Sequence, residues 1–230
     1  MAISQNYCSN CGHAAQLKRI DAHYIVHEIE HVLHFEKGIL YTIKELLIRP
    51  GQNTREFISD NRNRLVKPII FIIVTSLIYT IINQFFHIED GYVKFEETRK
   101  TNITLIFEWI QNHYGYGNMI MGIFIAFWLR LFFRKKDYNF FEILILLCFV
   151  MGIGMLIIAV FAIAEGLSKV PMMQISGVLV FFYCIWAIGQ FFDKSKISSY
   201  LKATAAYLLG MCTFLISAVL LGLLLDFVTQ

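Results

Sequence analysis

The chain has 230 residues, of which 57% are hydrophobic and 16% charged, and its formal net charge is +3. A typical soluble domain is about 45–50% apolar and about 25% charged, whereas this chain has a mean hydropathy of +0.58. Because the apolar excess lies in long runs, the sequence predicts an integral membrane protein. It excludes a secreted disulfide scaffold, a disordered tail and a soluble enzyme.

Residues 1–65 form a predicted cytoplasmic head, since the first twenty residues lack the apolar core of a secretory signal. Cys8 and Cys11, followed by a glycine, resemble one knuckle of a zinc ribbon. A closed zinc site needs four ligands, of which His13 would supply a third. The candidate cofactor is therefore zinc or another divalent metal, and the alternative interpretation is an unmetallated turn.

A histidine-rich stripe is the sharpest feature of the head. The spacing predicts an amphipathic helix over residues 21–35, with Ile25, Ile29 and Val32 on its apolar side. The opposite side carries four histidines at spacings of four, four and three residues: His23, His27, His31 and His34. Neighbours at these spacings can share a metal ion. A polar face at the inner leaflet, a contact with another helix and catalysis remain as alternatives.

Two shorter helices follow in the head. We expect one over residues 39–48, which Arg49-Pro50-Gly51 would stop. Asn53 with Glu56 three residues later predicts a capping box and a helix over residues 54–60. A basic stretch then precedes the membrane, and we expect Arg55, Arg62, Arg64 and Lys67 to bind anionic lipid headgroups rather than nucleic acid.

The remaining residues, 66–230, form a predicted transmembrane domain. Five apolar segments cover about 66–86, 118–133, 140–164, 172–192 and 201–227, and all except the second reach the roughly 20 residues that cross a bilayer. Counting Lys and Arg beside the segments gives nine, four and three on one side against four on the other. The positive-inside rule therefore predicts a cytoplasmic N-terminus and an external C-terminus.

The outer loop, residues 87–117, contains Ile103, Ile106, Phe107 and Ile110 at helical spacing beside Trp109. These residues predict an amphipathic helix on the outer interface, with a simple solvated connector as the alternative.

Inside the membrane we find no charged residue at mid-depth, which disfavours a proton-coupled transporter. Polar side chains are candidates for contacts between helices: Tyr79, Asn83 and Gln84 on the first segment and Gln190 on the fourth. We expect the single cysteines of the apolar runs to act as small packing residues: Cys148, Cys184 and Cys212.

The order and spacing of several short motifs over residues 8–90 resemble a known family. They are Cys8-Ser-Asn-Cys11-Gly, Arg19-Ile20, His23-Tyr24, His27-Glu28, Lys37-Gly38, Tyr41 to Leu47, Arg49-Pro50-Gly51, Thr54 to Ile58 and Lys67-Pro68. This pattern resembles DUF3667, a bacterial membrane family of unknown function that is common in Bacteroidetes. The resemblance implies a multi-pass protein of the inner membrane with a cytoplasmic head, and no activity. Family members pair two Cys-x-x-Cys knuckles, whereas this chain has only the second.

Three functions are compatible with these features. The first is a non-enzymatic inner-membrane protein, an all-α five-helix bundle whose head docks a cytoplasmic partner or sister subunits, with metal tuning the docking. The second is an oligomeric channel, pore or small-solute permease that is accessory to a larger system. The third is a metal-dependent membrane enzyme that uses the histidine stripe. The absence of catalytic motifs ranks the first above the others.

Overall fold

The computed structural model describes residues 38–86 and 101–228. The chain divides into two compact units, Met1–Gly38 and Ile39–Gln230, so the described residues belong almost entirely to the second. Over this part the chain forms α-helices joined by turns and loops, which confirms the all-α fold class there. The helix predicted over residues 21–35 lies outside the described residues.

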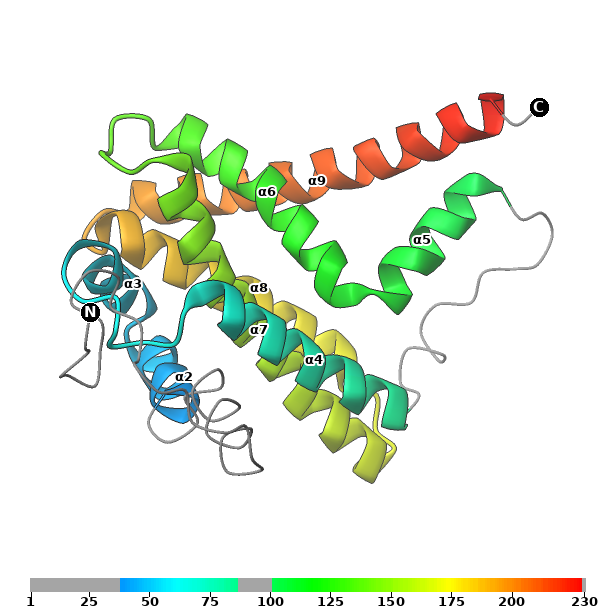
Figure 1. Cartoon of the computed structure of the whole chain (residues 1–230), viewed down its shortest axis with the longest axis horizontal. Helices are drawn as coiled ribbons and strands as arrows, with labels where there is room; N and C mark the ends of the chain where they lie inside the picture. The colour runs from blue at the N-terminus through cyan, green and yellow to red at the C-terminus, as the bar shows by residue number, and fades with distance from the viewer. Residues whose placement is uncertain (1–37, 87–100, 229–230) are drawn as a thin grey trace, which may run out of the picture. The chain divides into compact units, whose positions relative to one another are not determined.

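Eight helices are described, and five of them are long and apolar enough to cross a membrane (Figure 1). Those five are α4 (Pro68–Phe86), α6 (Tyr114–Phe132), α7 (Phe140–Ser168), α8 (Met173–Asp193) and α9 (Ile197–Val228). The three shorter helices are α2 (Ile39–Ile48), α3 (Pro50–Ser59) and α5 (Asn102–Asn112). The prediction of five candidate spans is confirmed, and the chain is consistent with a multi-pass membrane protein.

The second span, α6, begins four residues earlier than its apolar run predicts. The residues in question alternate tyrosine and glycine, a pattern typical of a turn, yet both glycines are buried within the helix. A Cβ atom added at Gly115 would lie 1.6 Å from the Ser76 Oγ atom of α4. The glycine is therefore needed for close packing between helices, and α6 reaches the same 19-residue length as α4.

Spans that follow one another in the sequence alternate in direction. A Cβ added at Gly152 of α7 would meet Phe71 near the start of α4, and one at Gly166 would meet Phe86 at its end, so α4 and α7 run in parallel. The turn between α7 and α8 is closed by Glu165, whose carboxylate accepts hydrogen bonds from the amides of Met172 and Met173 at 2.7 and 2.9 Å. Helices α4, α7 and α9 thus start at the end of the bundle that carries α3.

The core lies around α7, which packs against α4, α6 and α8 and has the most buried apolar segment of the five spans. Its buried side chains include Leu146, Phe149, Val150 and Ile153. On the other side of the bundle α6 packs closely on α9, where Gly210 lies against the backbone of Ile125. Most of the remaining surface of the spans is apolar and exposed, as expected for lipid-facing helices.

The amphipathic helix predicted in the outer loop is present as α5. A capping box between Thr101 and Thr104 starts it, with each side chain bonded to the other residue's backbone amide. Its Ile103 packs against Gly222 of α9, and Asn102 donates to the Asp226 carboxylate at 2.7 Å. The helix is confirmed, and its place at a membrane interface stays a prediction.

Candidate functional site

Residues 39–67, comprising α2, α3 and the loop that follows, form a unit that we call the α2–α3 platform. Helix α2 has the predicted bounds, but α3 begins at Pro50 rather than near Thr54. Pro50 ends α2 and occupies the first position of α3. The N–H that proline lacks would have no intrahelical partner at that position, so its absence costs nothing. The prediction that this proline only stops a helix was therefore incomplete.

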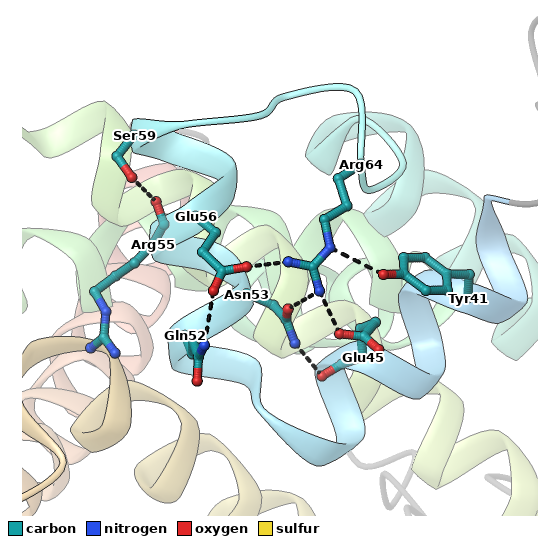
Figure 2. Close-up of polar contacts among 8 residues, drawn as sticks. All are labelled: Tyr41, Glu45, Gln52, Asn53, Arg55, Glu56, Ser59 and Arg64. Carbon is teal, nitrogen blue, oxygen red and sulfur yellow. Dashed lines mark hydrogen bonds and ion pairs between the residues drawn. The ribbon is translucent and has the colours of Figure 1, made fainter.

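The centre of the platform is a charge cluster around Arg64 (Figure 2). One guanidinium nitrogen binds Glu56, and another lies 2.7 Å from the Glu45 carboxylate and 2.8 Å from the Asn53 amide oxygen. The Nε atom donates to the Tyr41 hydroxyl at 3.0 Å. A planar guanidinium with five donors suits this arrangement of several acceptors, which one ammonium group could not reproduce.

Asn53 lies inside α3, so the predicted capping box was wrong. Its side chain is 3% exposed and donates to the Glu45 carbonyl at 2.7 Å while accepting from Arg64. The Glu56 carboxylate accepts a hydrogen bond from the Gln52 side chain and pairs with Arg64, so it does not cap a backbone amide at a helix start. The hydrogen bond from Gln52, together with the charge and hydrogen bond of Arg64, holds the pKa of Glu56 below its usual value.

Three hydrogen bonds join α3 to the end of α8. The Arg55 guanidinium donates to the carbonyls of Gln190 and Phe191, both at 2.7 Å. These carbonyls belong to the last turn of α8, where they lack intrahelical partners and where a positive charge is favourable. The Gly51 amide donates to the Gln190 side chain at 2.8 Å. Gln190, predicted to bond between helices, does so here.

The platform contacts the side of the bundle as well as the last turn of α8. Its buried side chains Leu46 and Phe57 share a core cluster with Phe149 and Ile153 of α7. With a rise of 1.5 Å per residue, those α7 residues lie about 14 and 20 Å from the start of that helix. The Tyr183 hydroxyl, from the middle of α8, donates to the Leu46 carbonyl at 3.1 Å. Helix α2 therefore lies at the depth of the spanning helices.

The outer face of α2 is apolar although no described residue covers it. Leu40, Leu47 and Ile48 are 80%, 46% and 55% exposed. Lys44 is exposed on the same helix, and a lysine side chain is long enough to reach a headgroup from an apolar surface. At the depth set by α7, acyl chains of one leaflet are the surroundings that suit this face.

The basic residues predicted to bind lipid differ in their surroundings. Arg55 and Arg64 are occupied by contacts within the protein, whereas Arg62 and Lys67 are exposed. Lipid binding by the four stays a prediction.

The predicted metal ligands all lie outside the described residues: Cys8, Cys11, His13, His23, His27, His31 and His34. Within the described part, no group of three His, Cys, Asp or Glu side chains is placed to hold a metal ion.

The polar residues of the first span do not come together with Gln190. Tyr79 is buried and its ring centroid lies 5.0 Å from that of Tyr114, with the two rings tilted by 50°, while Gln84 is exposed. The Asn83 amide oxygen is buried with no hydrogen-bond partner among the described residues. None of these residues lines the cavity that lies between α6, α7, α8 and α9.

Comparison with known proteins gives one match. The family model described as "Protein of unknown function (DUF3667)" matches residues 36–80, which confirms the resemblance over that segment. The matched segment contains α2, α3, the Arg64 cluster and the first part of α4. It thus corresponds to the α2–α3 platform and its attachment to the membrane domain. No curated protein and no solved structure matches the chain.

Proposed function

We propose that this is a non-enzymatic multi-pass protein of the bacterial inner membrane, whose N-terminal head docks a partner protein or sister subunits on the cytoplasmic side. The observation that carries the proposal is the attachment of the platform to the bundle through Arg55, Gly51 and Tyr183. A free cytoplasmic tail would not need these contacts with α8. Residues 1–38 join the platform directly, so whatever binds them is tethered to the membrane domain.

Charge supports the proposed orientation. The platform, the loop at residues 133–139 and the turn at 194–196 lie at the same end of the bundle, because α4, α7 and α9 all start there. Lys136 and Lys196 from those connections both approach the Asp193 carboxylate, at 3.6 and 3.4 Å. The basic residues of these described segments therefore gather at one end, which the positive-inside rule favours as the cytoplasmic end.

Photo-crosslinking in cells tests this function. A photoreactive amino acid at His27 or His31 is expected to give discrete adducts of higher mass. The same amino acid at Lys94, in the outer loop, is expected to give no adduct with a cytoplasmic protein. Co-expression of two differently tagged chains separates the two modes, because an adduct with both tags is a sister subunit. Loss of the adducts after metal chelation would assign the tuning role to metal. Full expression with no adduct at either histidine position would contradict the proposal.

A further inference from the structure

The strongest unassigned feature outside the platform is a cavity of about 200 Å³ between α6, α7, α8 and α9. Four of the chain's eight methionines line it, together with one cysteine: Met121, Met151, Met155, Met211 and Cys184. These sulfur-bearing residues come from four different helices, and each lies near the middle of its helix. Methionine is a common filler of irregular cores, but half of the chain's methionines around one open space exceeds what filling requires.

We propose that this cavity binds a soft monovalent metal ion, Cu(I), through the thioethers and the Cys184 thiolate. Thioether ligands together with a thiolate suit the soft ion Cu(I), whereas carboxylate and carbonyl ligands suit Mg²⁺, Ca²⁺ and Mn²⁺. The cavity wall carries no His, Asp or Glu among its described lining residues. The lining therefore offers one thiolate where a zinc site uses three or four Cys, His or carboxylate ligands, and no carboxylate for magnesium or calcium. The proposed site is separate from the candidate ligands in the head.

Charge balance also favours a monovalent ion. Cys184 is 1% exposed in the middle of α8, where an uncompensated charge is costly. One thiolate neutralises one Cu(I), so the occupied site has no net charge, while a divalent ion would leave one. On binding, the thiol proton passes to the buffer, as it does when other thiol ligands bind metal. Cys184 belongs to the apolar core, as expected of a packing residue, so the proposal adds metal binding to that role.

One of the methionine sulfur atoms lies against a glycine of a neighbouring helix. The Met151 sulfur faces α6 at Gly122, where an added Cβ would be only 3.2 Å away. Tyr207 of α9 lines the same cavity as Cys184. The methionines have three rotatable bonds each, so their thioethers can close around an ion that is smaller than the empty cavity.

Metal binding to the full-length protein in detergent tests the proposal. The Cys8→Ser/Cys11→Ser chain removes the head thiols and is titrated with Cu(I), in the presence of ascorbate and a competing Cu(I) chelator. We expect one Cu(I) per chain with only sulfur in its first coordination shell by X-ray absorption. Absence of chelator-resistant Cu(I), or a shell of nitrogen and oxygen, would overturn the proposal.

Variants identify the ligands. Met151→Leu/Met155→Leu and Cys184→Ala, made in the same background, are expected to lower the affinity at least tenfold. Met119→Leu/Met172→Leu removes two methionines that do not line the cavity and is expected to leave the affinity unchanged. Equal affinity in all variants would overturn the assignment.

A second measurement uses the protein without substitutions, so it does not depend on whether a variant folds. In protein carrying ¹³C-methyl methionine, addition of Ag(I), which mimics Cu(I), is expected to shift the methyl signals of the four cavity methionines. The signals of Met119, Met172 and Met173 are expected to stay in place. Shifts confined to these three would contradict the proposal.

Discussion

Replacement of Gly51 by alanine is expected to detach the α2–α3 platform and to destabilise the membrane domain by about 3 kcal/mol or more. An added Cβ would lie 2.3 Å from the Phe191 backbone nitrogen and 2.5 Å from the Gln190 carbonyl carbon. These atoms belong to the backbone of α8 and cannot turn aside as a side chain could. Helix α3 would move away, losing the bonds from Gly51 and Arg55 to α8.

Thermal or SDS-induced unfolding in detergent measures this effect. The matched control is Gly177→Ala on α8, where no heavy atom lies within 4 Å of an added Cβ. Alanine is a better helix former than glycine by about 0.8–1 kcal/mol, so the control should be unchanged or slightly more stable. Similar stability of the two variants would show that α3 and α8 are not in contact.

Replacement of Arg64 by methionine is expected to destabilise the platform by about 2 kcal/mol, because two carboxylates and the buried Asn53 lose their shared donor. A fully buried pair would lose more, but the side chains of Arg64, Glu45 and Glu56 are 34%, 23% and 33% exposed. Arg64→Lys keeps the charge without the planar fork and should recover only part of the loss. The control Arg62→Met removes an exposed cation and should change stability by less than about 0.5 kcal/mol.

The same variant should alter the dependence of stability on pH. Because the folded pKa of Glu56 lies below its ordinary value of 4.5, its contribution to stability is complete above that pH. The contribution is lost as the pH falls through the lower, folded pKa. The stability difference between the wild type and Arg64→Met should therefore be constant near neutral pH and shrink in acid. A difference that grows in acid would contradict the role given to Arg64.

The membrane spans were predictable because a run of apolar residues of sufficient length has few alternatives in water or lipid. The boundaries of α4 and α8 differ from the prediction by two residues or fewer at each end, and α2 matches it. The start of α6 was missed because Gly115 and Gly117 are typical of turns. Their role in close packing depends on α4 and α5, which the local sequence does not reveal.

The platform could not be predicted from local patterns. Arg64 binds partners that are 8, 11, 19 and 23 residues away, and Arg55 binds carbonyls 135 and 136 residues away. Asn53 and Glu56 fit a capping box by spacing, and only the tertiary contacts with Glu45 and Arg64 override it. The basic stretch is evident in the sequence, but its pattern does not distinguish the paired Arg55 and Arg64 from the exposed Arg62.

Thiol labelling of the platform tests the central claim, which is that α2, within the head predicted over residues 1–65, is part of the membrane domain from which residues 1–38 extend. In a chain whose five native cysteines are replaced, Leu47→Cys on the outer face of α2 is compared with Asn63→Cys in the exposed loop after α3. With a membrane-impermeant maleimide, Asn63→Cys is expected to react rapidly in inside-out vesicles and not in intact cells. Leu47→Cys is expected to react in neither preparation until the membrane is dissolved. Equally rapid labelling of both positions in inside-out vesicles would place α2 in water and contradict the account.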